Sequence, residues 1–369
     1  MSDPDGEQDV ISDKNAAPSS QKSRSGTLKR ILLLLLVVCM FAGGAAALGM
    51  NWLDKTLNQP RSYAGQTFSI NQGDTLKGFI ARLQRAGIVD EPYSLALYAR
   101  YKGLAGKLHT GQYIFTDGLS LVEVLDAITS GKYRLSHSFT FVQGSTFKQL
   151  RESLAAAETV QHTLGGTTNA EVLALFDASA QYAHPEGLFF PETYAYDPGA
   201  SDEEIMRRAY LTMQATLQKL WEERDPDIEI KSAYEALILA SIIEKETALA
   251  SERKQISGVF MNRLRKGMKL QTDPTVIYGL GDSYNGNITR KHLTTDTPYN
   301  TYTRHGLPPT PISMPGYAAI EAALHPQQTE AIFFVARGDG SGGHNFSKTL
   351  SEHNKAVKKY LKNRRKNAG

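Results

Sequence analysis

The sequence predicts an α+β protein with three successive parts: a single N-terminal transmembrane helix, a small α/β subdomain and a larger mixed α+β domain. Three observations lead to this prediction. A run of about twenty residues near the N-terminus carries no charge, which suits a membrane-spanning helix. Short strand-like and helical segments are mixed along the rest of the chain. The length of 369 residues is enough for two or three domains.

The N-terminal segment predicts a membrane anchor. Residues 1–30 are polar, so we expect a disordered tail. Residues 31–50 have the length needed to cross a hydrocarbon core as a helix. Basic residues precede this run, which places the tail in the cytoplasm and the rest of the chain on the periplasmic or extracellular side of the cytoplasmic membrane. These basic residues are Lys22, Arg24, Lys29 and Arg30, whereas Asp54 and Lys55 follow the run.

A cleavable signal peptide is the alternative interpretation of the same run. Three features favour a retained anchor over it. The run is long, it begins after some thirty residues, and residues 43–47 offer only a loose small-residue cleavage site. Trp52 is then expected at the membrane interface on the outer face.

A short linker, residues 51–65, leads to the predicted subdomain over residues 66–138. Residues 68–77 predict a short strand, a turn and a helix whose first residue is capped by Asp74 or Thr75. The subdomain is therefore expected to begin with a strand–turn–helix unit.

The same strand–turn–helix pattern returns about seventy residues later, over residues 139–148. The turn reads Gln-Gly-Asp-Thr in the first copy and Gln-Gly-Ser-Thr in the second. Between the copies, residues 108–115 predict a strand and residues 120–128 a capped amphipathic helix. The second copy opens the larger domain, which we place at residues 139–363, followed by a basic tail at 364–369.

An apolar helix that ends in two glutamates is the central element of the larger domain. Residues 236–243 carry no charge and precede Glu244 and Glu246. At about 100° per residue, Glu246 shares one helix face with Leu239, Ile242 and Ile243, whereas Glu244 lies roughly 160° away. A carboxyl group in line with an aliphatic face is expected to be half removed from water, which raises its pKa. Such an acid suits general acid catalysis of glycosidic cleavage.

Two segments of the larger domain can also be explained without a catalytic or sugar-binding role. Both glutamates could instead be solvated or paired with Lys245 or Arg253. Residues 187–196 hold four aromatic side chains around Glu192, which suits sugar stacking, although aromatic side chains more often fill a core.

Polar residues in loops rich in glycine and proline follow the glutamate helix, and such loops commonly carry functional sites. A second amphipathic helix is predicted over residues 251–264 and ends at Gly267. Thr272 or Asp273 can then cap a helix that has Pro274 in its first position. A further helix over residues 315–324 and a strand over 331–336 come next.

Composition excludes several classes of function. The net charge is +3, with 21% charged residues, which is not the profile of a nucleic-acid-binding protein. Cys39 is the single cysteine, so no intramolecular disulfide forms. The histidines lack the paired spacing of a zinc site, and neither a Gly-x-x-x-x-Gly-Lys loop nor a Gly-x-Ser-x-Gly elbow occurs. We therefore expect no metal, no cofactor and no nucleic-acid partner.

Six motifs together resemble the endolytic murein transglycosylases (the MltG or YceG-like family). The resemblance extends from about Phe68 to Leu361, in addition to the single N-terminal membrane helix. The motifs are Ala240–Thr247, Phe260–Leu264, Leu270–Gly279, Tyr299–Tyr302, Gly306–Pro309 and Gly343–Phe346.

The resemblance implies a membrane-anchored lytic transglycosylase with a LysM-like subdomain beside its catalytic domain. Such enzymes cut the MurNAc–GlcNAc bond inside nascent peptidoglycan strands and leave a 1,6-anhydro-MurNAc end, an activity expected to end strand elongation. Peptidoglycan strands and the cytoplasmic membrane are the implied partners, together with penicillin-binding peptidoglycan synthases. The opening of residues 66–138 is close to a LysM module, which grips N-acetylated glycans, but its later part departs from that pattern. A unit that only packs against its neighbour remains the alternative.

The family's catalytic glutamate is the second of its Glu-Lys-Glu, which falls on Glu246. The candidates for orienting sugar hydroxyl and N-acetyl groups are Gln271, Asp273, Asn300 and Tyr302, with Glu192 as a weaker one. Each could equally serve as a helix cap or a loop hydrogen bond. Two other functions stay open: a non-catalytic glycan-binding scaffold, and a hydrolytic muramidase in which Asp273 serves a water.

Overall fold

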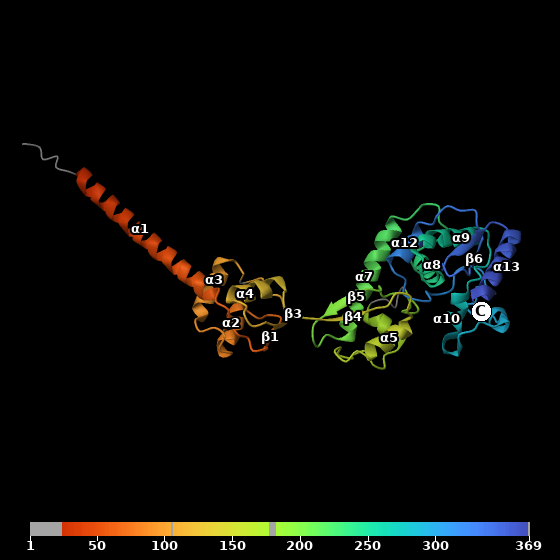
Figure 1. Ribbon diagram of the computed structural model, residues 1–369, viewed down its shortest axis with the longest axis horizontal. Helices are drawn as coiled ribbons and strands as arrows, with labels where there is room; N and C mark the ends of the chain where they lie inside the picture. The colour runs from red at the N-terminus through yellow and green to blue at the C-terminus, as the bar shows by residue number, and fades with distance from the viewer. Residues whose placement is uncertain (1–23, 105, 177–181, 368–369) are drawn as a thin grey trace, which may run out of the picture. The chain divides into compact units, whose positions relative to one another are not determined.

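The computed structural model describes residues 24–104, 106–176 and 182–367 (Figure 1). The chain divides into two compact units, the first ending at Tyr133 and the second beginning at Arg134. Both units mix helices and short strands, so the predicted α+β class is confirmed. The disordered tail expected over residues 1–30 lies outside the described residues up to position 23, and its last part, residues 24–30, is helical in the structure.

Helix α1 (Arg24–Leu57) is the single described helix long and apolar enough to cross a membrane, and its qualifying segment runs from Lys29 to Leu57. The helix continues beyond residue 50, where the sequence predicted its end. The first part of the linker expected over residues 51–65 is helical, up to Leu57. Leu53 and Leu57 explain the extension: both are buried, at 7% and 1% exposure, in the hydrophobic core of the first unit. The C-terminal turns of α1 therefore belong to a folded unit.

The first unit packs three helices against an antiparallel strand pair. Strands β1 and β2 pair in register from Thr67 with Ile114 to Ile70 with Gly111. Thr75 caps α2, and Ser120 forms a capping box with Glu123 at the start of α4. The elements are β1 (Thr67–Ile70), α2 (Leu76–Arg85), α3 (Pro92–Tyr101), β2 (Gly111–Ile114) and α4 (Leu121–Ser130).

The second unit begins with the repeated strand–turn–helix pattern. Its turn contains Gly144 at a φ of +75°, and the matching Gly73 of the first unit has +87°. This left-handed geometry favours glycine at both turns. Thr146 then caps α5 as Thr75 caps α2. The elements are β3 (Arg134–Leu135), β4 (His137–Thr140), α5 (Phe147–Ala155), α6 (Asn169–Leu175), β5 (Thr193–Tyr196) and α7 (Asp202–Glu222), with β4 and β5 paired antiparallel.

Helix α8 (Ala233–Glu246) lies at the centre of the second unit, in contact with α7, α9, α10 and α12. All its side chains from Ala236 to Ile243 are buried, as the uncharged run predicted. Helix α13 also includes the first residues of the expected basic tail. The remaining elements are η1 (Ala250–Glu252), α9 (Arg253–Arg265), α10 (Asp273–Leu280), η2 (Gly281–Ser283), α11 (Arg290–Thr294), α12 (Tyr317–Leu324), β6 (Phe333–Ala336), β7 (His344–Ser347) and α13 (Leu350–Asn367).

The aromatic segment over residues 187–196 serves the core. Phe189, Tyr194 and Tyr196 are all at most 7% exposed, and Phe190 packs against the same cluster. These rings pack against other protein side chains, the ordinary alternative that the sequence left open.

Candidate functional site

Glu246 is the last helical residue of α8, and its side chain is half-buried. The helix ends there because Thr247 takes an extended conformation, with ψ of 135°. Burial raises the pKa of Glu246 to about 7, the Thr272 hydroxyl that donates to its carboxylate lowers the pKa, and the negative charge of Asp273 raises it. No lysine, arginine or histidine within the described ranges forms an ion pair with Glu246. The carboxyl group can therefore hold a proton near neutral pH.

Thr272 is fixed in place by a small cluster of buried threonines. It is the N-cap residue of α10, yet its hydroxyl does not cap that helix and donates to Glu246 instead. Its backbone N–H donates to the Thr301 hydroxyl at 3.1 Å, and the hydroxyls of Thr275 and Thr301 lie 2.9 Å apart. The donor that faces Glu246 is thus held in place by the hydroxyl groups of Thr275 and Thr301.

Glu244 lies two residues earlier in a different electrostatic environment. Its carboxylate accepts hydrogen bonds from the Gln143 amide at 2.7 Å and from the Gly316 backbone N–H at 3.0 Å. The Arg253 guanidinium lies 3.8 Å away, and the Glu244 side chain is 8% exposed. The pairing with an arginine that the sequence left open for both glutamates therefore applies to Glu244, a buried and compensated carboxylate.

Two of the residues predicted to bind substrate, Asp273 and Tyr302, lie beside Glu246, and Gln271 directly precedes Thr272 in the chain. The Tyr302 hydroxyl donates to the Asp273 carboxylate at 2.6 Å. The negative charge of Asp273 raises the pKa of Glu246, and the negative charge of Glu246 in turn raises the pKa of Tyr302. Burial, followed by the hydrogen bond to Asp273, raises the pKa of Tyr302. Gln271 is exposed and has a φ of +50°, a strained conformation for a residue other than glycine. Strained backbone of this kind is often found at functional sites.

Asn300 and Glu192 are placed differently. Asn300 is 1% exposed, and its amide nitrogen donates to three backbone carbonyls of residues 292–295. Its side-chain oxygen accepts from the Tyr302 backbone N–H at 2.9 Å, so Asn300 holds the loop that carries Tyr302. Glu192 is exposed just before β5, and no contact found among the described residues joins it to Glu246.

Arg263 of α9 is a site residue that the sequence interpretation missed. Its guanidinium is largely buried and donates to the carbonyls of Lys269 and Leu270 at 3.0 and 2.9 Å. It thereby supports the backbone that leads to Thr272, and its positive charge lowers the pKa of Glu246. A basic residue in the last turn of an amphipathic helix ordinarily faces solvent, so periodicity gave no signal for this role.

Glu186 is a second buried acid, and it lies in a cleft of about 1020 Å³ beside α5 and α10. Its carboxylate accepts from the Phe147 backbone N–H at 2.9 Å and from the Tyr278 hydroxyl at 3.0 Å. Burial raises the pKa of Glu186 to about 7, although these hydrogen bonds lower it. Lys245, next to Glu246 in the chain, also lines this cleft. The cleft therefore reaches the C-terminal end of α8.

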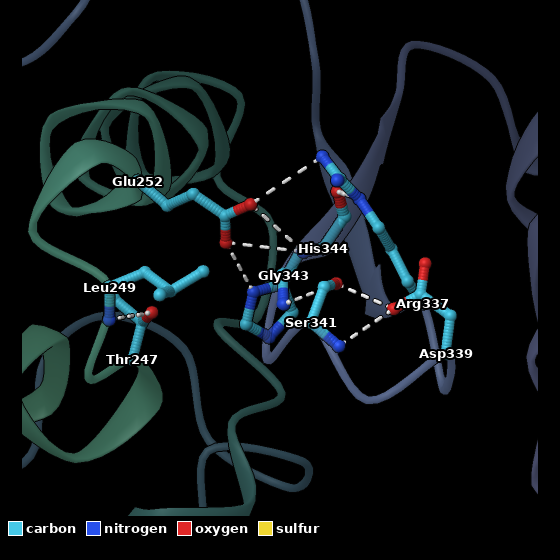
Figure 2. A network of polar contacts seen from close by, with 8 residues as sticks. All are labelled: Thr247, Leu249, Glu252, Arg337, Asp339, Ser341, Gly343 and His344. Carbon is cyan, nitrogen blue, oxygen red and sulfur yellow. Dashed lines mark hydrogen bonds and ion pairs between the residues drawn. The ribbon is translucent and has the colours of Figure 1, made fainter. Parts of the chain in front are cut away.

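A polar network fixes the chain where it leaves Glu246 (Figure 2). The Glu252 carboxylate of η1 accepts from the His344 backbone N–H at 3.0 Å and from its ring Nδ1 at 2.7 Å, and Arg337 lies 3.7 Å away. These contacts tie the segment between α8 and α9 to the β6–β7 hairpin. Within the described ranges, no group of three or more histidine, cysteine, aspartate or glutamate side chains could hold a metal ion.

The site is thus defined by one half-buried carboxylic acid without a cationic partner, at the end of a buried helix and among polar groups on loops. This arrangement can supply a proton to a bound molecule and accept one afterwards. A second carboxylate for nucleophilic attack is not part of the contacts described around Glu246, except for Asp273, which is bound by Tyr302.

The chain belongs to the YceG-like family, whose model matches residues 68–359. It is 30% identical over 339 residues to an endolytic murein transglycosylase from Bacillus subtilis, with 87% of this chain and 91% of the relative covered. A protein of the same name from Streptococcus pneumoniae is 27% identical over 301 residues, which cover 73% of this chain but 54% of that relative. A crystal structure of a YceG-like protein from Listeria monocytogenes is 29% identical, with a TM-score of 0.49, and the match covers 79% of this chain and 98% of that one.

Proposed function

We propose that this protein is a membrane-anchored lytic transglycosylase that cuts the MurNAc–GlcNAc bond inside nascent peptidoglycan strands and so ends strand elongation. The single observation that carries the proposal is Glu246, whose half-buried carboxyl group has no cationic partner among the described residues and whose pKa is raised to about 7 by burial. The family membership and the relatives named endolytic murein transglycosylase support the same activity.

The proposed reaction uses Glu246 twice. The protonated carboxyl group gives its proton to the glycosidic oxygen while the bond from that oxygen to C1 of MurNAc breaks and an oxocarbenium-like centre forms. The resulting carboxylate then takes the proton of the C6 hydroxyl of the same sugar, and O6 closes on C1 to give the 1,6-anhydro ring. Ordinary glycosidases need two carboxylates. Here one suffices, because the nucleophile is part of the substrate and has a high effective molarity.

The loop residues around Glu246 are proposed to orient the sugar. Asp273 and Tyr302 share a hydrogen bond of 2.6 Å, and both present polar atoms near Glu246. Gln271 is exposed and directly precedes Thr272 in the chain. Asn300 contributes indirectly, through the loop that carries Tyr302.

The length of the apolar segment of α1, from Lys29 to Leu57, supports a retained anchor over a cleaved signal peptide, whose apolar region is shorter. Leu53 and Leu57 at its C-terminal end are also part of the core of the first unit, so the proposed anchor runs directly into that unit. We propose that the N-terminus faces the cytoplasm and that both compact units lie outside. In this place the enzyme would work beside the penicillin-binding synthases that extrude new strands, and a LysM-like role of the first unit would add glycan binding.

The test is the analysis of products from purified peptidoglycan by mass spectrometry, for the wild-type protein and for Glu246→Gln. We expect the wild type to release anhydro-ended fragments and Glu246→Gln to release none while it remains folded. Glu152→Gln is the matched control, because Glu152 is an exposed carboxylate on the cleft wall. It should retain activity.

Each other outcome identifies a different function. Reducing ends in place of anhydro ends would mean a hydrolytic muramidase, and intact strands bound by the wild type would mean a scaffold. Near-normal activity of Glu246→Gln, together with loss of activity in a folded Glu244→Gln, would show that the acid was assigned to the wrong residue.

A further inference from the structure

We propose that helix α3 lies on the surface of the phospholipid bilayer that α1 spans, with an apolar stripe of three side chains inserted between the lipid headgroups. The stripe consists of Tyr93, Leu97 and Tyr101. This inference rests on the anchoring part of the proposed function and concerns a face of the first unit that the catalytic proposal does not use.

The stripe is an exposed apolar face of a helix whose other face is buried. Tyr93, Leu97 and Tyr101 are 86%, 62% and 70% exposed. Their spacing of four residues places them within about 80° of one another around the helix axis. Leu95 and Ala99 point the opposite way and have no exposed surface. A helix with one face in the core ordinarily turns charged and polar side chains to water, so the exposed stripe indicates a partner.

The contact between α3 and α1 places the stripe at the height of the membrane surface. The two helices touch, and the buried side chains of α1 among those described are Leu53 and Leu57. They share a hydrophobic cluster with Leu95 and Ala99 of α3. At about 1.5 Å per residue, Leu53 lies about 5 Å and Leu57 about 10 Å beyond Met50, where the uncharged run ends. The headgroup layer occupies about the same height. Figure 1 shows α3 beside the point where α1 enters the rest of the unit.

The side chains of the stripe suit this position. Tyrosine is enriched at membrane interfaces, because its ring enters the acyl boundary while its hydroxyl stays hydrated. Arg100 is exposed and lies about 60° from Leu97 around the helix axis, on the side of the stripe, where its guanidinium group can meet lipid phosphates. A bilayer therefore accounts for both the apolar and the charged part of this face, and continuity with the membrane helix α1 favours it over a protein partner.

The test uses the full chain in vesicles of phosphatidylethanolamine and phosphatidylglycerol. Cys39→Ser removes the single cysteine, and Leu97→Cys then carries an environment-sensitive NBD label. Ile114→Cys is the matched control, since Ile114 is also an exposed apolar residue of the first unit but belongs to strand β2. Lipids brominated near the glycerol end of the acyl chain quench only labels at the interface. We expect quenching and a blue-shifted emission at position 97, and neither effect at position 114.

Four results would overturn the inference. Absence of quenching at position 97 would mean that α3 faces water. Equal quenching at both positions would mean that the signal is not specific to the stripe. A blue shift at position 97 that grows with the ratio of protein to lipid, without bromine quenching, would assign the stripe to a second copy of the chain. A chain that fails to float with the vesicles would show that α1 does not anchor it in the membrane. The catalytic proposal is tested separately, by the anhydro-product assay.

Discussion

Replacement of Thr272 by valine tests whether the Glu246 environment sets the pH range of the enzyme. The Thr272 hydroxyl donates to the Glu246 carboxylate and so favours its ionised form. A hydrogen bond to a charged group contributes about 1.5 to 3 kcal/mol, and one pKa unit corresponds to about 1.4 kcal/mol. Loss of the hydroxyl should therefore raise the pKa of Glu246 further, by about one to two units, while the isosteric valine keeps the packing.

The sign of the effect on activity follows from the role of Glu246 as a general acid. Wild-type activity should fall as pH rises through the pKa of Glu246, which is about 7. In Thr272→Val, the carboxyl group stays protonated to a higher pH, so this alkaline limb should move upward by about one to two units. The assay is the initial rate of anhydro-fragment release as a function of pH, under conditions in which the protein remains folded.

Thr275→Val is the matched control. Thr275 belongs to the same buried cluster, with no exposed surface, but its hydroxyl contacts Thr301 and the Thr272 carbonyl and not Glu246. It should lower stability and leave the alkaline limb in place. An unmoved limb in Thr272→Val, or one displaced to lower pH, would refute the argument that this hydroxyl stabilises the ionised acid. A shift of equal size in Thr275→Val would refute its specificity.

Three further predictions concern stability. The carboxyl group of Glu246 has a pKa of about 7 in the folded protein, against an ordinary 4.5. The stability that the protonated group gives to the folded state is therefore fully present below pH 4.5 and is lost as pH rises through 7. Between pH 4 and 8, the free energy of urea unfolding of Glu246→Gln should rise by about 3 kcal/mol relative to that of the wild type. Glu244→Gln removes the charge partner of Arg253, whose side chain is 13% exposed, and should lower the free energy of unfolding by about 3 kcal/mol at pH 7. An unchanged urea midpoint would contradict the pairing. In Gly258→Ala the new Cβ would lie 2.2 Å from the Gln327 carbonyl oxygen, so thermal unfolding should show a net loss of about 1 to 3 kcal/mol despite the better helix propensity.

Helices and their caps could be predicted from the sequence, because they depend on residues close together in the chain. The first turn offered Asp74 or Thr75 as the helix cap, and the structure shows that Thr75 caps α2 and that Thr146, at the matching position of the second turn, caps α5. The burial of α8 followed from its uncharged run. The position of Glu246 on the aliphatic face likewise indicated an acid half removed from water, and its raised pKa agrees with that expectation.

The partners of these side chains could not be predicted, since they come from distant segments. Gln143 reaches Glu244 across 101 positions of the chain, and Tyr278 reaches Glu186 across 92. No local pattern marks Glu186 as buried, because a single glutamate beside a turn is ordinarily solvated. The extension of α1 through Leu57 also depends on tertiary packing, as the core of the first unit covers that residue.

The two glutamates at the end of α8 have different roles, and the contacts of Glu244 account for the high pKa of Glu246. Glu244 binds Gln143, Gly316 and Arg253 from three different segments, and so fixes the last turn of the helix against its surroundings. With that turn fixed, Glu246 needs no cation to hold it, and burial alone can keep its pKa high. If Glu246 were the paired residue, the arginine would lower its pKa and remove the proton that the cleavage step needs. Because Glu244 takes the contacts with Arg253, Gln143 and Gly316, Glu246 can remain protonated two residues later. Neighbouring carboxyl groups in different environments are expected to take such separate roles.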